Sequence, residues 1–143
     1  KIPLAMLGRT VMVGAVLLWA FVGLGLLVSV RTRHAAKAVV AGLVVWALAV
    51  AALDLGVVGL LLNMRVSPQL VFGLAGVNPV QAARLALLSG IEPDLGTLGP
   101  VGFYLVHHVG SAGLLAYGLA WPLVVGTASW LLAARSFARG DLV

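Results

Sequence analysis

One acid stands out in an otherwise apolar run of this chain. Asp54 lies between apolar segments, and a carboxylate at membrane depth is costly enough to favour a functional role. At about 1.5 Å per residue from Lys37 at the inner face, however, Asp54 lies about 25 Å along a helix, near the outer boundary of the membrane and not at its midplane. Two interpretations stay open: Asp54 pairs with Arg65 or Arg84 or caps a helix break, or it takes a direct part in transport.

The adjacent histidines His107 and His108 indicate either a metal or haem ligand or polar residues at a membrane surface. Neighbouring residues of a helix diverge by about 100°, so only one of them can face a given site. His34 cannot complete a pair, because it belongs to a loop about a bilayer thickness away. The surface interpretation is favoured, and a metal contact together with Glu92 or Asp94 is the alternative.

Motifs for catalysis and nucleotide binding are missing from the sequence. It has no GxxxxGK[ST] loop and no serine, histidine and acid spaced as in a hydrolase. With no cysteine, disulfides, zinc ribbons and thiolate-bound iron–sulfur clusters are excluded. We therefore expect a chain that is not an enzyme and has no catalytic, cofactor or metal site; any ATP and Mg would be bound by a partner.

The composition indicates a membrane protein. Of 143 residues 62% are hydrophobic and 9% charged, and the mean hydropathy is +1.15, whereas soluble domains are about 45–50% apolar and about 25% charged. The net charge of +5 falls at a few boundaries, which does not favour nucleic-acid binding. The first apolar run has no cleavage site, so it is not a secretion signal, and we expect the chain to be the tail of a longer protein.

Three apolar runs predict an all-α integral membrane fold with three transmembrane helices. They cover about 10–30, 38–62 and 103–134, the first lying between Arg9 and Arg31. At about 1.5 Å per residue, each is long enough to cross a hydrocarbon core about 30 Å thick. The whole chain, 1–143, is then one transmembrane domain.

Basic residues set the expected orientation of these spans. The loop 31–37 and the tail 135–143 are basic, so both should be cytoplasmic, whereas the loop 63–102 has no net charge and should be extracytoplasmic. The basic residues, which are also candidates to contact a cytoplasmic partner, are Arg31, Arg33, Lys37, Arg135 and Arg139.

The extracytoplasmic loop predicts two short helices, each starting at a capping residue followed by proline. The first covers Pro68 to Ala75, and the second starts after Asn78 and covers Pro79 to Leu88. Both are too short to cross a bilayer. Because Gln81 and Arg84 form a narrow polar stripe, the second helix should lie at the membrane interface or dip into a protein-lined cavity.

The last apolar run carries two further packing signals. Ala112, Ala116 and Ala120 recur every four residues, a spacing that lets helices approach closely in lipid and predicts partner helices. Pro122 should kink the helix, because proline removes a hydrogen bond and crowds the preceding turn.

Local stretches along nearly the whole chain match a known pattern. They are Leu27 to Arg33; Trp46 with Asp54 to Leu61; Asn78-Pro79 with Arg84-Leu85 and then Leu98 to Gly102; and Trp121-Pro122 with Phe137 to Leu142. The most specific part is Asn-Pro-x4-Arg-Leu followed by Leu-Gly-Pro. In these stretches the chain resembles the C-terminal half of ABC-2-type permeases, most closely the NosY group, which supports nitrous oxide reductase maturation.

The resemblance implies a multi-pass subunit of the bacterial or archaeal inner membrane with six helices, of which this chain holds the fourth to sixth. It implies a second permease copy, a cytoplasmic ATP-binding subunit, a periplasmic protein partner and a service to copper-centre assembly. Asp54, Asn78, Pro79 and Arg84 are then candidates for an outer gate. The alternative is a small structural subunit that only anchors a larger membrane complex.

Overall fold

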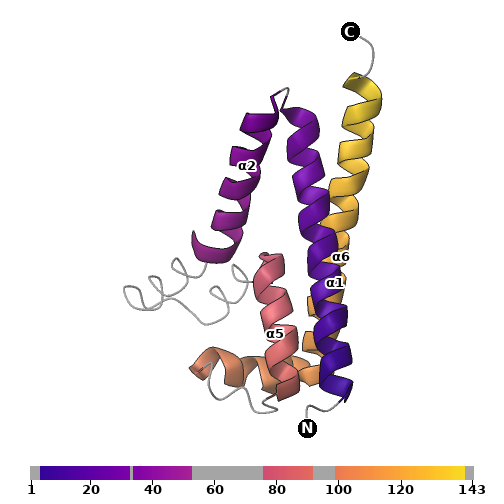
Figure 1. The fold of residues 1–143 in the computed structure, drawn as a ribbon. Helices are drawn as coiled ribbons and strands as arrows, with labels where there is room; N and C mark the ends of the chain where they lie inside the picture. The colour runs from indigo at the N-terminus through magenta and orange to yellow at the C-terminus, as the bar shows by residue number, and fades with distance from the viewer. Residues whose placement is uncertain (1–3, 33, 53–75, 92–98, 141–143) are drawn as a thin grey trace.

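Every element that the computed structural model describes is a helix (Figure 1). The structure describes residues 4–32, 34–52, 76–91 and 99–140. No strand occurs among these residues, which confirms the all-α prediction.

Helix α1, Leu4–Arg31, contains the first predicted span and begins six residues earlier. Arginine is a good helix former, so Arg9 continues the helix instead of ending it. Arg31 stands in the last turn, where a cation favours the negative end of the helix dipole. Thr32 then closes the end: its Oγ1 donates to the Val28 carbonyl at 2.9 Å.

Helix α2, Ala35–Ala47, runs back beside α1 and passes into a π-helical turn, η1, Leu48–Ala52. In a π-helical turn the hydrogen bonds join residues five apart in place of four, so the hydrogen-bond register of the preceding α-helix changes there. Residues 53–62, with which the second predicted span ends, lie outside the described residues, and so does Asp54.

Helix α6, Gly99–Gly140, changes direction at Gly110, where φ is +70° and ψ is 164°. That positive φ suits glycine, which lacks the Cβ that would clash. Within the described side chains, the part of α6 that is long and apolar enough to cross a membrane is Val109–Arg139, which overlaps the predicted span 103–134. Gly110 is the only residue of α6 with non-helical backbone angles, so the break lies there and not at the predicted Pro122, which is fully buried inside the helix.

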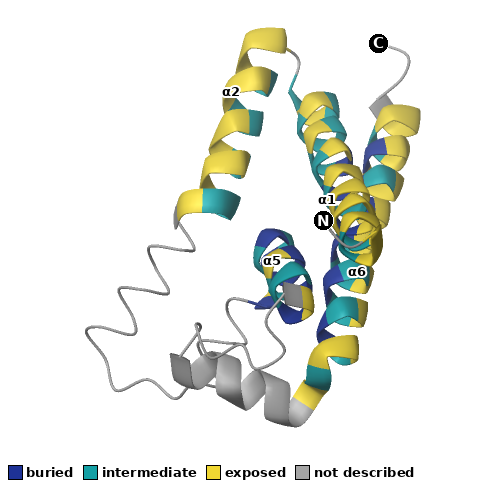
Figure 2. Cartoon of the chain, turned by 60° about the horizontal axis from the view of Figure 1, so that its bottom comes forward, coloured by how far each residue is buried: buried dark blue, intermediate teal, exposed yellow. Residues whose placement is uncertain are grey.

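Helices α1 and α6 pack side by side and in parallel. Ala20 lies against Gly126, and farther along Gly23 approaches Ser129 and Trp130. The short helix α5, Pro79–Ile91, lies against both. Figure 2 shows the buried residues gathered where these three helices meet, whereas α2 has no buried residue.

Two helices are long and apolar enough to cross a membrane, which supports a membrane protein. They are Leu4–Arg31, with a mean hydropathy of 2.6, and Val109–Arg139, with 1.5. Only 17% and 22% of their most apolar windows are buried. A core helix of a water-soluble protein would bury most of such a surface, whereas lipid leaves it exposed at no cost.

Candidate functional site at the buried start of α5

Asn78 and Pro79 start α5 as the sequence predicts. The Val80 amide donates to Asn78 Oδ1 at 3.0 Å, and the Ala82 amide donates to the Asn78 carbonyl at 3.0 Å. Pro79, the first helical residue, needs no amide partner there. The helix ends at Ile91, three residues beyond the predicted Leu88.

The start of α5 lies part way along α1. Trp121 Nε1 donates to the Val77 carbonyl at 2.8 Å. Because Ala20 and Gly126 are neighbours, Trp121 is level with about residue 15 of α1, six residues and about 9 Å inward from Arg9. The start of α5 thus lies between other helices; whether this is the membrane interface or a protein-lined cavity stays a prediction.

Two side chains of α6 bind the backbone that leads into α5, and a third, that of Asn78 within this backbone, binds η1. Trp121 holds the Val77 carbonyl, and the Tyr117 hydroxyl donates to the Gly76 carbonyl. The amide of Asn78, a residue only 3% exposed, donates from Nδ2 to the Ala49 carbonyl in η1 at 2.5 Å. Backbone outside a helix is tolerated at this depth only where protein groups satisfy it, and these bonds do so.

Close backbone packing fixes α5 against α6. A Cβ placed on Gly118 would lie 2.5 Å from the Ala82 carbonyl oxygen and would clash with the Ala86 side chain. Ala82 and Ala86 are themselves fully buried. Glycine at this position therefore lets the two helices touch, which brings Tyr117 and Trp121 within reach of the start of α5.

Arg9 of α1 holds the other end of α5. Its Nε donates to the Ala86 carbonyl at 2.9 Å, and its Nη2 donates to the same carbonyl and to Ser89 Oγ, the latter at 2.6 Å. A cation at the C-terminal end of a helix interacts favourably with the negative end of the helix dipole. Helix α5 is thus bound at its start to α6 and η1, and at its end to α1.

The groups that make these bonds are amides, an indole, a hydroxyl and one guanidinium. None of them is suited to exchange protons with a substrate near neutral pH. Among the described residues no three His, Cys, Asp or Glu side chains come close enough to hold a metal ion. These hydrogen bonds can fix the position of the short helix α5 relative to α1, α6 and η1.

The candidate gate residues are only partly brought together. Asn78 and Pro79 form the buried start of α5, whereas Arg84 lies one and a half turns along on an exposed face. Arg84 and Gln81 both have interaction partners. Asp54 and its predicted pairing with Arg65 or Arg84 lie outside the described residues.

The candidate cytoplasmic contacts gather at the opposite end from Arg9. Arg31, Lys37, Arg135 and Arg139 are all exposed. The turn between α1 and α2 and the last turns of α6 lie at the same end in Figure 1. Arg33 lies outside the described residues, as do the side chains of His107 and His108.

Sequence reasoning missed the residues that bind α5. The sequence pattern marks Arg9 only as the boundary of the first predicted span, and it assigns no hydrogen-bonding role to Tyr117 or Trp121. The available signal is that Tyr117 and Trp121 stand four residues apart on an apolar helix, so that two polar-tipped aromatics share one face. Their partners, 41 and 44 residues away, cannot be read from spacing.

Comparison with protein-family models, with curated proteins and with solved structures finds no match to this chain.

Proposed function

We propose that this chain is part of the membrane-spanning permease subunit of an ABC transporter, which couples ATP hydrolysis in a partner to transport or to a conformational signal across the membrane. One observation carries the proposal: the buried start of α5 is hydrogen-bonded to both α6 and η1. A shift of α6 along its axis or across its neighbours must move α5 with it.

The route of this coupling follows α6. Its exposed Arg135 and Arg139 lie at the end that the positive-inside rule assigns to the cytoplasm, where an ATP-binding subunit would bind. Trp121 lies 18 residues before Arg139, about 27 Å along a continuous helix. Movement imposed at the basic end then reaches the start of α5, which lies about 9 Å inward from the level of Arg9.

The finer assignments rest on the resemblance to NosY-type permeases. They comprise inner-membrane location, completion of the second predicted span, 38–62, beyond Ala52, a second permease copy, a periplasmic partner and copper-centre maturation of nitrous oxide reductase. In this scheme Asp54, Asn78, Pro79 and Arg84 form the outer gate, the chain is not an enzyme, and ATP and Mg bind to the partner subunit.

The test uses the full-length protein with its copurified ATPase in nanodiscs. A single cysteine, Arg84→Cys, reports the position of α5 by its rate of reaction with a water-soluble maleimide. We expect Mg-ATP to change this rate. Adding Trp121→Phe removes the bond to Val77 and should abolish the change while ATP hydrolysis continues.

The matched control is Trp130→Phe, because the indole Nε1 of Trp130 is buried without a hydrogen-bond partner in the described part of the chain. It should leave the ATP-dependent change intact. If the labelling rate at position 84 is the same with and without Mg-ATP while the complex hydrolyses ATP, the result favours the alternative, a structural subunit that anchors a larger membrane complex. Charge reversal at Arg84 that leaves both hydrolysis and reductase maturation intact would remove Arg84 from the gate.

A further inference from the structure

Helix α6 changes direction at a single residue. Gly110 has a φ of +70° and a ψ of 164°, whereas the residues on either side of it have helical backbone angles. The helix therefore consists of a short arm, residues 99–109, and a long arm, residues 111–140, joined at Gly110. Figure 1 shows the short arm turned across the lower end of the bundle, on the side of the long arm where α5 lies.

The backbone angles of Gly110 are ones that glycine adopts readily and other residues do not. A positive φ combined with a ψ near 180° is essentially restricted to glycine, because a Cβ would clash with the backbone. In the described part of the chain, nothing lies within 4 Å of a Cβ placed on Gly110. The bend is therefore set by the angles of one residue and not by a side chain wedged against it.

A second glycine provides space beside the bend. A Cβ placed on Gly113 would lie 2.8 Å from Cγ1 of Val109, the last residue of the short arm. In a continuous helix the Cβ atoms of residues four apart are about 5–6 Å from each other, which leaves room for alanine at position 113. The bent arrangement thus needs glycine at 113, whereas a straight helix does not.

The bend lies at the end of the bundle opposite the basic residues. Ala20 and Gly126 are neighbours on helices that run in parallel, so Gly110 is level with about Leu4. This level is five residues, about 7–8 Å, outward from Arg9. The short arm therefore starts where α1 ends.

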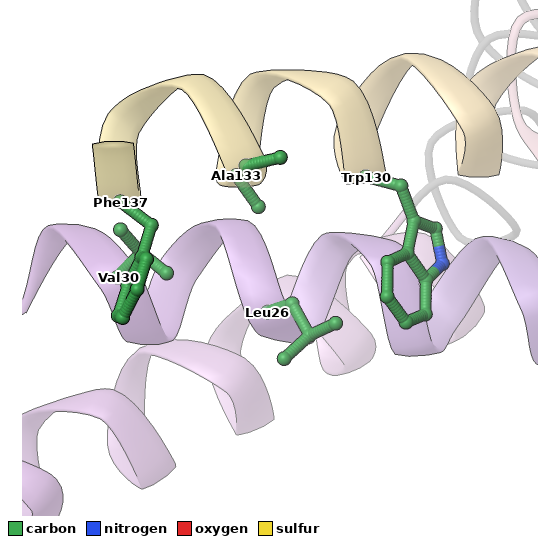
Figure 3. A pocket seen from close by; sticks show the side chains of 6 residues that line it. Leu26, Val30, Trp130, Ala133 and Phe137 are labelled. Atoms are coloured by element: carbon green, nitrogen blue, oxygen red, sulfur yellow. The ribbon is translucent and has the colours of Figure 1, made fainter. Parts of the chain in front are cut away.

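The long arm is held against α1. Trp130 stacks on Trp19, with ring centroids 5.1 Å apart, and a Cβ on Gly23 would lie 2.8 Å from Trp130 Cδ1. Figure 3 shows side chains of the two helices meeting across an open groove that Val30 and Phe137 help to line. Because the long arm is fixed in this way, a change in the angles of Gly110 moves the short arm.

We propose that Gly110 is a hinge at which the short arm swings between the bent arrangement and a straighter one with a negative φ, and that Gly113 makes room for Val109 in the bent arrangement. Only one residue has to change its angles, and residues at the ends of elements absorb such changes in hinge motions. The inference rests on the geometry of α6 and not on coupling to an ATPase.

The length of the chain before the short arm permits this motion. The short arm has 11 residues and is about 17 Å long. The seven residues 92–98, which join Ile91 to Gly99, can span up to about 26–29 Å. The connection to α5 is therefore longer than the arm that swings.

The experiment measures distances between two spin labels by double electron–electron resonance. The full-length protein is placed in nanodiscs and diluted with unlabelled protein, so that only distances within one chain are measured. Labels on Val101→Cys and Ala128→Cys would be about 40 Å apart in one straight helix and are closer in the bent arrangement. We expect both a shorter and a longer distance.

A second pair of labels controls for the fold of the long arm. Ala112→Cys and Leu131→Cys place labels on two exposed positions about 28 Å apart along it. This pair should give one distance in every variant.

Glycine substitutions should change the ratio of the two distances. Gly110→Ala should raise the proportion of the longer distance about 5- to 30-fold relative to the shorter one, because alanine disfavours the positive φ. Gly25→Ala is the matched control, since nothing described lies within 4 Å of a Cβ there, and it should leave the ratio unchanged.

Gly113→Ala should also favour the longer distance, because it crowds Val109 only in the bent arrangement. Adding Val109→Ala removes Cγ1 and leaves a Cβ 3.9 Å from the new methyl group, so the double variant should restore the original ratio. Since Gly113→Ala keeps Gly110, it tests the hinge even if Gly110→Ala does not fold.

A longer distance that is absent from the unmodified protein, from Gly110→Ala and from Gly113→Ala would overturn the proposal. So would a shift in Gly113→Ala that Val109→Ala does not reverse. No ATPase takes part in these measurements, so either result leaves the permease proposal standing. Conversely, two distances without ATP-dependent movement of α5 would retain the hinge and favour the anchoring subunit.

Discussion

At the scale of single residues, a few side chains decide where α5 lies. Arg9 joins α1 to the last turns of α5, and Asn78 joins the first turn to η1. Both donate to backbone carbonyls in part-buried surroundings, those of Ala86 and Ala49. Because a buried carbonyl without a donor costs free energy, each bond stabilises this one position of α5 over any displaced one.

Replacing Arg9 should loosen the end of α5. Arg9→Met keeps an unbranched side chain but removes the guanidinium donors to the Ala86 carbonyl and to Ser89 Oγ, so the free energy of unfolding should fall by about 1.5–3 kcal/mol. Thermal unfolding in a mild detergent measures the change. The exposed Arg139→Met serves as the control and should stay within about 0.5 kcal/mol of the original; equal losses in both would contradict the assigned role of Arg9.

Substitutions at Asn78 should separate its two bonds. Asn78→Ser keeps an oxygen that can accept from the Val80 amide but cannot reach the Ala49 carbonyl, whereas Asn78→Ala loses both bonds. We expect Asn78→Ala to lower the free energy of unfolding by about 1–3 kcal/mol and Asn78→Ser to lower it less. Amide hydrogen exchange at residues 80–82 follows the cap directly, and faster exchange in Asn78→Ser than in Asn78→Ala would be inconsistent with this account.

At the scale of elements, close helix contacts depend on glycine in α6. Gly118 meets Ala82 and Ala86 of α5, and Gly126 meets Ala20 of α1. The predicted small-residue face, Ala112 with Ala116 and Ala120, is exposed, so none of the described helices packs there. Its expected partner helices stay a prediction.

An added methyl group should therefore have opposite effects at different glycines. At Gly118 alanine would overlap the backbone of α5, and we expect a loss of about 1–3 kcal/mol together with faster exchange throughout α5. At Gly14 nothing lies within 4 Å, so alanine should stabilise α1 by about 0.5–1 kcal/mol through its higher helix propensity. Unfolding midpoints of the two variants in the same detergent give the comparison, and a shift of the same sign in both would contradict the close contact.

Capping and hydropathy patterns predicted where helices lie better than they predicted which residues contact one another. The uncharged run after Arg9 predicted α1, and Asn78-Pro79 predicted the start of α5, because caps and hydropathy act over a few residues. The break at Gly110 was missed, since glycine is common inside membrane helices and nothing nearby marks this one. The bonds from Arg9 to Ala86 join residues 77 apart, and spacing carries no information on such pairs.

At the scale of the whole molecule, the account depends on how the ends of the helices are distributed. Helices α1 and α6 run in parallel, which places Arg31, Lys37, Arg135 and Arg139 at one end and Arg9 with the end of α5 at the other. The proposed permease requires this polarity, because one end would face the ATPase and the other would carry the gate.

The most direct test is a map of which positions face the cytoplasm. The chain has no cysteine of its own, so Leu4→Cys, Lys37→Cys and Arg139→Cys each introduce a single reactive group into it. A maleimide that cannot cross the membrane is added to intact cells from outside. We expect it to label Leu4→Cys and to reach Lys37→Cys and Arg139→Cys only after the membrane is opened; labelling that places positions 37 and 139 on opposite sides would contradict the account.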